Sequence, residues 1–127
     1  MKVHPYLFVA GVVGLLALGA TPARAQEHAQ FDNHDRQVTA DWYNQHKNNP
    51  PRGLRPQDRL SADEEARLQP GKTLDRQLQR KTHSVPRDLA RRLPPAPPHH
   101  RYQTIGGHVV LVDTRDHRVR DVIHVHD

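Results

Sequence analysis

The stretch from Tyr102 to Asp113, YQTIGGHVVLVD, decides the fold of this 127-residue chain. Its centre, Gly106-Gly107, signals a two-residue β-hairpin turn, because both positions of such a turn need the positive φ angles that glycine adopts freely. Residues 101–105 supply one strand with Tyr102 and Ile105 as apolar anchors, and residues 108–113 supply a β-branched second strand. That second strand is apolar at successive positions, so we expect it to be covered on both faces.

The residues after the hairpin add a third strand. Residues 114–117 are polar and turn-like, and residues 118–125, RVRDVIHV, follow as a strand candidate. With a period of two, Val119, Asp121 and Ile123 share one face, which we expect to be the core side. Asp121 then needs a partner there, either a backbone amide or an arginine. Three strands alone are marginally stable, so helices must cover the meander.

Two short helices are predicted upstream of the meander. Ser61-Ala62-Asp63-Glu64 has the pattern of a capping box and begins a helix that Pro70-Gly71 ends. Leu74 and Leu78 are one helical turn apart and indicate a second short helix.

A third helix and an extended strap lie between these helices and the hairpin. Pro86 suits a first helical turn, and Leu89 and Leu93 fall on one face after it. Residues 93–98, LPPAPP, must be extended. The predicted fold class is therefore α+β, with a disordered N-terminal arm, two or three short helices, a Pro-rich strap and a C-terminal three-stranded antiparallel β-meander.

The chain begins with a predicted signal peptide, residues 1–25. Lys2 precedes an apolar run over residues 6–19, and Ala23-Arg24-Ala25 provides a cleavage signature before Gln26. The run is shorter than the ~20 apolar residues of a membrane-spanning helix. We expect cleavage after Ala25 and a periplasmic protein that is soluble once cleaved.

Two parts are expected after cleavage: a flexible polar arm over residues 26–58 and a small α+β domain over residues 59–127. The arm is rich in Asn, Gln, His and Pro, a composition that favours disorder. Val38, Trp42 and Tyr43 are spaced at i, i+4 and i+5, which leaves open a turn or two of helix.

Composition excludes several function classes. The chain has no cysteine, so disulfides, thiolate metal sites and thiol redox chemistry are absent. Lys2 and Arg24 leave with the signal peptide, so 17 basic against 14 acidic residues give the exported chain a net charge of +3. Charges of both signs are interspersed without an aromatic-studded basic stripe, so no nucleic-acid partner is expected. No nucleophile, metalloprotease or phosphate-loop motif occurs, and we expect no enzyme activity.

Histidine is the unusual component, because 10 of the 11 histidines remain after cleavage. Imidazole suits nickel, cobalt, copper and zinc. His124 and His126 fall on one strand face and form the first candidate metal site. His28 forms the second, because a third-position histidine and a free N-terminal amine can enclose a square-planar copper or nickel ion. Cyclisation of Gln26 would remove that amine.

Other histidines are weaker candidates. His99 and His100 are adjacent, which makes sharing one ion difficult, and His34 and His46 flank the aromatic pair. The competing interpretation for all of them is that exposed histidines only keep a polar segment solvated.

Several motifs in order resemble the RcnB/CigR-type family of small periplasmic proteins. The resemblance covers residues 31–123 and is most specific in the C-terminal half. It is carried by Trp42-Tyr43, PRGL at 51–54, LQPGKTL at 68–74, VPRDL at 85–89, LPPAP at 93–97, YQTIGGHVVLVD at 102–113 and VRDVI at 119–123. It implies an α+β periplasmic protein that is not an enzyme. One branch of the family is tied to nickel and cobalt homeostasis, and another to inner-membrane or virulence control; neither supplies an agreed set of metal ligands.

The leading interpretation is a periplasmic, non-enzymatic accessory protein that modulates nickel/cobalt homeostasis or efflux. It would act by weak ion binding or by contact with an inner-membrane transporter. The alternative is an envelope interaction protein that binds an inner-membrane protein without any metal role. A structural stress protein is the third possibility.

Overall fold

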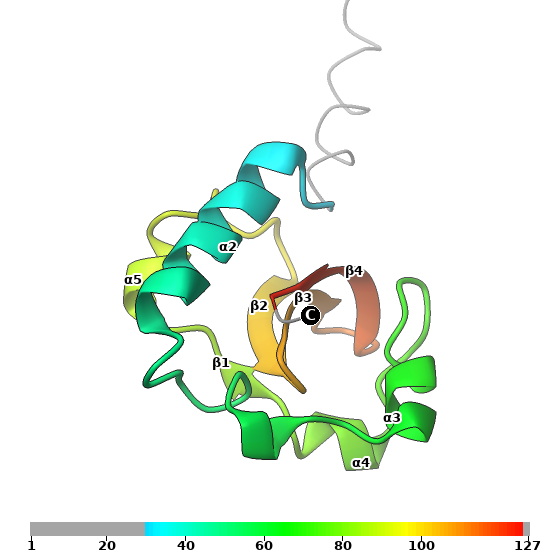
Figure 1. Ribbon diagram of the computed structural model, residues 1–127. Helices are drawn as coiled ribbons and strands as arrows, with labels where there is room; N and C mark the ends of the chain where they lie inside the picture. Colours follow the sequence, from blue (N-terminus) through cyan, green and yellow to red (C-terminus); the bar gives the residue numbers. More distant parts are fainter. Residues whose placement is uncertain (1–29, 126–127) are drawn as a thin grey trace, which may run out of the picture.

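The structure, a computed structural model, describes residues 30–125. The predicted signal peptide, His28 and His126 lie outside these residues. Within them, no helix has the length and apolarity needed to cross a membrane. The elements (Figure 1) are α2 (Asn33–His46), η1 (Pro56–Asp58), α3 (Ala62–Arg67), α4 (Arg76–Gln79), β1 (His83–Ser84), α5 (Arg87–Ala90), β2 (His100–Ile105), β3 (His108–Asp113) and β4 (Arg118–His124).

The strands form one antiparallel sheet in the order β1-β2-β3-β4. The α+β class is confirmed, with four strands in place of the predicted three. The added strand, β1, pairs only His83 and Ser84 with β2. Two polar residues carry no alternating apolar pattern, so nothing in the sequence marks them as a strand.

The hairpin at Gly106-Gly107 is confirmed. Both glycines have positive φ, 61° and 85°, as a two-residue turn between twisted strands requires. A Cβ on Gly106 would lie 2.5 Å from Cγ of Leu60, so the turn also needs a glycine for close packing. All six residues of β3 are buried, which confirms that this strand is covered on both faces.

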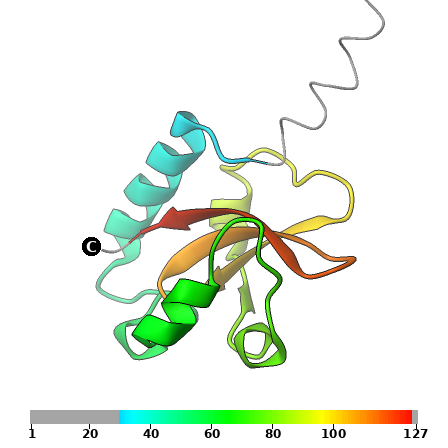
Figure 2. The same ribbon diagram turned by 90° about the vertical axis from the view of Figure 1, so that its right-hand side faces the viewer.

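The sheet lies between α2 on one side and α3 and α4 on the other (Figure 2). Each face of the sheet has its own core of buried side chains. The α2 face consists of Phe31, Trp42, Leu54, Leu89, Leu93, Val109, Leu111 and Ile123. The α3–α4 face consists of Leu68, Leu74, Leu78, Ile105, Val110, Val112, Val119 and Val122.

A β-bulge in β4 corrects the predicted strand faces. Leu111 pairs with Asp121 and Val112 with Val119, so Arg120 is an extra residue without a partner on β3. An extra residue reverses the side on which the following side chains fall. Val119 therefore lies on the α3–α4 face, whereas Ile123 lies on the α2 face.

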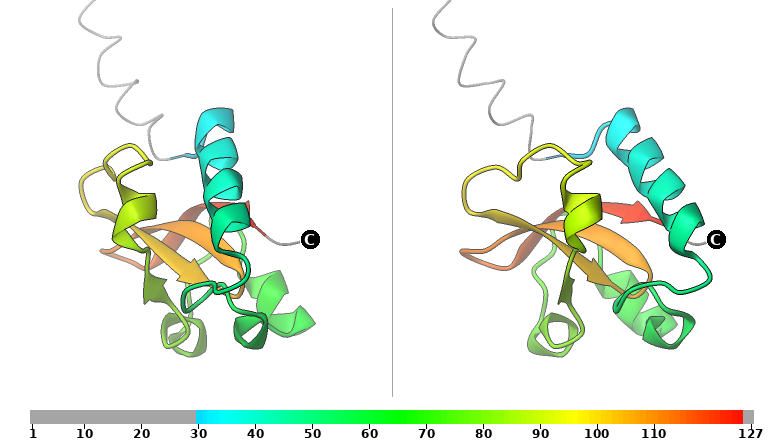
Figure 3. Two further views of the ribbon diagram at one scale, coloured as in Figure 1. Left: turned by 60° about the vertical axis from the view of Figure 1, so that its left-hand side comes forward. Right: turned by 90° about the vertical axis from the view of Figure 1, so that its left-hand side faces the viewer.

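Residues 30–58 are not the flexible arm that their composition indicated. Asp32 caps α2 in a reciprocal capping box with Asp35, and the helix runs for 14 residues. Trp42 is only 1% exposed. A polar helix of this kind is held by a few large apolar anchors, because most helical stability in proteins comes from tertiary packing. Trp42 also donates from Nε1 to Oδ2 of Asp88 at 2.8 Å, joining α2 to α5 on the same side of the sheet (Figure 3).

Asp121 on β4 fastens the start of α2 to the sheet. Its Oδ2 accepts from the backbone N–H of Phe31 at 2.8 Å and from the Arg36 guanidinium at 3.2 Å. Arg36 also donates to the carbonyl of Val122 at 3.0 Å. The expected partner of Asp121 is confirmed, with a backbone amide and an arginine present together.

The upstream elements follow the predicted order. The capping box of Ser61 and Glu64 is confirmed and begins α3. Helix α4 begins at Arg76, after the N-cap Asp75. It therefore includes Leu78 but not Leu74, and is shorter than the spacing of these two leucines predicted. The proline strap is tied to β2 by the Tyr102 hydroxyl, which donates to the Pro94 carbonyl at 2.7 Å.

Candidate functional site

Of the two leading candidate metal sites, only His124 falls among the described residues. It ends β4 and is exposed. Within residues 30–125, no group of three or more His, Asp or Glu side chains is arranged to hold a metal ion. Nδ1 of His100, one of the weaker candidates, contacts the Pro98 carbonyl at 2.8 Å and is thus already engaged.

The structure joins His124 to two residues that the sequence did not single out, forming the Glu65–His108–His124 triad. Nδ1 of His124 lies 2.9 Å from Nδ1 of His108, and the two rings meet edge to face. Nε2 of His108 lies 2.8 and 2.9 Å from the two carboxylate oxygens of Glu65. The His108 side chain is 2% exposed, whereas that of Glu65 is 34% exposed.

The bulge in β4 creates this contact. Asp113 pairs with Arg118 at the start of the β3–β4 ladder. Continued without a bulge, that register would place Ile123 opposite His108. The extra residue shifts the ladder by one, so His124 pairs with His108.

The geometry of the triad limits its protonation states. With Glu65 ionised, Nε2 of His108 must carry a proton to donate. When His108 is neutral, its Nδ1 accepts and His124 donates from Nδ1; when His108 is protonated, this bond reverses and Nε2 of His124 carries the hydrogen. The neutral form is the one that concerns a metal ion. In that state Nε2 of His124 holds a lone pair, and no side chain of residues 30–125 engages it.

With His108 neutral, this arrangement meets one requirement of a metal ligand. Ligating histidines generally donate their second N–H to a neighbouring acceptor, which fixes the tautomer and the ring orientation. His108 supplies that acceptor for His124, and Glu65 orients His108. The described residues thus provide one oriented ligand atom, and further ligands would have to come from elsewhere, such as the predicted partner His126.

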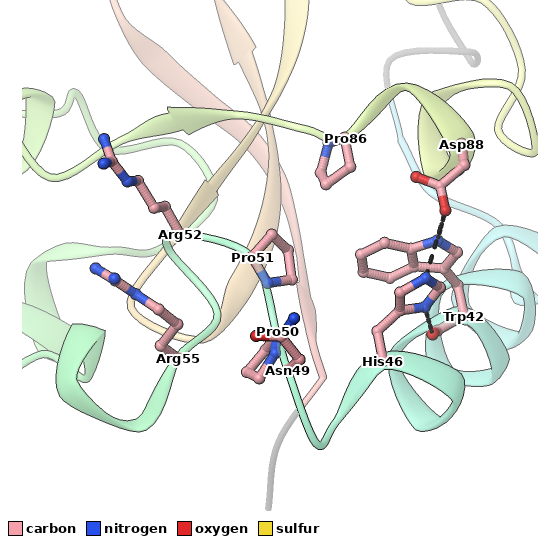
Figure 4. Close-up of a pocket in the computed structure, with 9 residues that line it drawn as sticks. All are labelled: Trp42, His46, Asn49, Pro50, Pro51, Arg52, Arg55, Pro86 and Asp88. Carbon is pink, nitrogen blue, oxygen red and sulfur yellow. Dashed lines mark hydrogen bonds and ion pairs between the residues drawn. The ribbon is translucent and has the colours of Figure 1, made fainter.

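A second feature is an open pocket of about 430 Å³ beside Trp42 (Figure 4), here called the Trp42 pocket. It is lined by Trp42, His46, Asn49, Pro50, Pro51, Arg52, Arg55, Pro86 and Asp88. The His46 ring stacks on Trp42 with centroids 4.2 Å apart, and its Nδ1 contacts the Trp42 carbonyl at 2.8 Å. Arg52 and Arg55 lie across the prolines from these rings.

The loop that carries Arg52 is fixed to the sheet. The Thr104 hydroxyl donates to the Arg52 carbonyl at 2.8 Å, and the Gly107 N–H donates to the Gly53 carbonyl at 2.7 Å. Gly53 has a φ of 89°, and a Cβ there would lie 2.3 Å from Oγ1 of Thr104. The glycine in the PRGL motif is therefore required for the approach of this loop to β2.

The Trp42 pocket is suited to binding. The Trp42 N–H holds the pKa of Asp88 below its ordinary value, with a smaller contribution from His46, whose Nε2 lies 3.5 Å from the carboxylate. The pocket thus presents the Asp88 carboxylate beside His46 and the Arg52 guanidinium across the apolar proline rings, whereas Arg55 is paired with Asp58.

Sequence reasoning missed Glu65 and His108. His108 follows the hairpin turn directly, so its burial could be read from the apolar run that it begins. The partners of His108 could not be predicted, because its pairing with His124 depends on the bulge and its contact with Glu65 spans 43 positions.

Comparisons with known proteins give a fold relationship. No protein-family model matches the sequence, and neither does any curated protein. Among solved structures, the C-terminal domain of inner membrane protein CigR from Salmonella enterica is similar, with a TM-score of 0.54 and 19% identity. The alignment covers 81% of this chain and 91% of that domain. The chain therefore has a CigR-like fold.

Proposed function

We propose that this chain is an exported, non-enzymatic accessory protein of the periplasm that modulates nickel or cobalt homeostasis through its C-terminal histidines. The observation that carries the proposal is the Glu65–His108–His124 triad, which orients the His124 ring and, with His108 neutral, leaves Nε2 of His124 as an acceptor atom. The signal-peptide pattern of residues 1–25 supports export. The CigR-like fold supports an envelope role, because the similar domain belongs to an inner membrane protein.

The donor set suits weak binding of a borderline ion. Imidazole nitrogen favours nickel, cobalt, copper and zinc over hard cations such as magnesium. His124 would be the inner ligand and His126 its companion, with His28 as a separate N-terminal site. A site with few protein ligands binds and releases an ion readily, as an accessory protein that passes metal to an inner-membrane exporter requires.

Native mass spectrometry of the protein purified from a periplasm tests this function. The intact mass reports cleavage after Ala25 and the state of Gln26, and titration with nickel, cobalt, copper and zinc counts bound ions. We expect one ion at the C-terminal histidines that is lost in His124→Ala and His126→Ala, and, where Gln26 keeps its free amine, a second ion that is lost in His28→Ala. His34→Ala is the matched control, since His34 is exposed on α2 and outside the triad.

Glu65→Gln tests the triad itself. Loss of a group that orients a metal ligand lowers affinity by about 10–100-fold, so Glu65→Gln should weaken binding without abolishing it. Spectra free of bound ion for all four metals, or equal affinity in His124→Ala and His34→Ala, would contradict the metal function.

The alternative function is an envelope interaction protein that binds an inner-membrane protein without metal. The Trp42 pocket favours it, since a fixed concave surface with aromatic, proline and arginine groups is suited to a protein segment. A photo-crosslinking residue at exposed Asn49, compared with one at Asn33 at the far end of α2, would capture such a partner in intact cells. Capture at Asn49 alone, with no metal bound, would establish this function in place of the first.

A further inference from the structure

A smaller pocket of about 230 Å³ lies between η1 and the segment that joins α4 to β1. It is lined by Gln57, Asp58, Arg59, Arg80, Lys81 and His83. Three of these side chains are cationic, one is a carboxylate and one is an imidazole. Two segments more than twenty positions apart in sequence therefore bring their basic groups to one concavity, here called the Arg59–Arg80 pocket.

The carboxylates near this pocket are already bound by other groups. Asp58 accepts from Nε and NH2 of Arg55 at 2.8 and 2.9 Å and from the Gly53 N–H at 2.8 Å. These bonds, from Arg55 first, lower the pKa of Asp58 to about 2, so it is ionised and fully engaged at neutral pH. Glu64 likewise binds Lys81.

Arg59 and Arg80 keep their charge available. Both are exposed, and no carboxylate of residues 30–125 pairs with either guanidinium. The arginines of β4 and of its turn differ, since Arg115, Arg118 and Arg120 all pair with aspartates. The Arg59–Arg80 pocket is therefore a place of uncompensated positive charge, although the exported chain as a whole is close to neutral.

The surroundings extend this charge. Residues 76–101 contain a single acidic residue, Asp88, against seven basic ones: Arg76, Arg80, Lys81, Arg87, Arg91, Arg92 and Arg101. In Figure 3, α4, β1 and α5 follow one another along the side of the molecule formed by the β1 edge of the sheet. The pocket thus lies on the side of the molecule that this basic segment follows.

We propose that the Arg59–Arg80 pocket binds a phosphate group, with Arg59 and Arg80 as the charged donors from its two sides. Guanidinium forks match phosphate oxygens and form the stronger, charge-assisted class of hydrogen bond. A tetrahedral oxyanion offers acceptors in several directions, so it can be reached from η1 and from the α4–β1 segment together. The volume of about 230 Å³ admits a headgroup-sized anion. The phosphate can belong to a phospholipid headgroup or to a soluble ion, and the proposal is independent of metal binding.

Two probes separate these sources: inorganic phosphate in titration calorimetry, and vesicles of phosphatidylcholine with phosphatidylglycerol in a flotation assay. The test variant is Arg59→Gln with Arg80→Gln. Its matched control is Arg91→Gln with Arg92→Gln, which removes the same charge from exposed positions outside the pocket. Because hydrogen bonds to charged groups are the costly ones to lose, we expect the test variant to lose about tenfold or more in affinity, and the control much less.

The outcomes are distinct. Pocket-dependent binding of the vesicles alone supports the proposal and assigns a lipid headgroup; pocket-dependent binding of free phosphate supports it and assigns a soluble ion. Equal losses of affinity in the two double variants would mean that general surface charge causes the binding, and would overturn the proposal. Absence of binding to either probe would overturn it as well. Arg80→Gln alone, which should give a partial loss, covers the case in which the double variant folds poorly.

Discussion

The α2 face and the α3–α4 face of the sheet are stabilised by different kinds of contact. On the α3–α4 face, the eight buried core residues are all aliphatic. The α2 face instead contains Phe31 stacked on Tyr102 at 5.8 Å and Trp42 bonded to Asp88 at 2.8 Å. The α3–α4 face therefore has an aliphatic core beside the Glu65–His108–His124 triad, whereas the α2 face builds aromatic rings and a tryptophan hydrogen bond into the core itself.

This difference explains why the short helices of the α3–α4 face could be predicted from the sequence, whereas the helix of the α2 face could not. The leucines of the α3–α4 face lie in short segments with helix caps and stop signals. The contacts of the α2 face span long separations, such as 90 positions between Phe31 and Asp121. Contacts of that length leave no periodic pattern, so residues 30–58 resembled a polar arm.

The largest expected effect is on the α2 face. Trp42→Ala removes its largest fully buried side chain, and such substitutions cost about 3–5 kcal/mol in the free energy of unfolding. Urea denaturation followed by far-UV circular dichroism measures the loss, since Trp42 is the chain's one tryptophan and its fluorescence disappears in the variant. A loss below about 1 kcal/mol would mean that α2 contributes little to the fold.

The second effect is on the α3–α4 face. Leu78 has a relative exposure of 0%, and Leu78→Ala should cost about 2–5 kcal/mol, because a buried leucine leaves a cavity. The same denaturation experiment compares the two faces. Since β3 carries core residues of both, each variant should unfold in a single transition. Two separate transitions in either variant would show that the faces unfold independently.

Local sequence patterns were sufficient for much of the fold. The Gly106-Gly107 turn, the buried strand after it and the Ser61–Glu64 capping box were all predictable from neighbouring residues, because each is stabilised within a few positions. Strand β1 was not, since its two residues are placed by pairing with β2 alone.

The candidate site was predictable only in part. His124 was identified by its residue type and strand position. Its connection to His108 depends on the bulge at Arg120, and an insertion of one residue between two ladder pairs has no compositional signal in RVRDVIHV. The histidine abundance therefore pointed to the end of the sheet where the triad lies, whereas the contacts of the triad required the register.

The third expected effect concerns the hydrogen bonds by which Asp121 holds the start of α2 against the sheet. Asp121→Ala leaves the Phe31 N–H and the Arg36 guanidinium without their shared acceptor. Hydrogen bonds to charged groups contribute about 1.5–3 kcal/mol, so we expect a loss of that size by urea denaturation. Asp63→Ala is the control, because its side chain is 88% exposed and should change stability by less than about 0.5 kcal/mol. Equal effects of the two variants would mean that the hydrogen bonds of Asp121 add no specific stability to the α2 face.

The smallest effect is a pH dependence at the rim of the α3–α4 face, where Glu64 of α3 binds Lys81. Lys81 first, and then the Ser61 N–H, lower the pKa of Glu64 from 4.5 to about 2. A carboxylate whose pKa is lowered by folding stabilises the protein above its unfolded pKa, and that contribution disappears as the pH falls through the folded one. The stabilisation should thus be complete above about pH 4.5 and decline towards pH 2.

Glu64→Gln isolates this contribution, because Asp58 and Asp113 also have lowered pKa values and remain in the variant. The difference in unfolding free energy between wild type and Glu64→Gln should be constant above pH 5 and shrink steadily in acid. We expect it to be smaller than the effect of Asp121→Ala, since the Lys81 side chain is 43% exposed and salt screens the pair. A difference that did not change between pH 6 and pH 2.5 would mean that burial, and not the charge of Glu64, stabilises this rim.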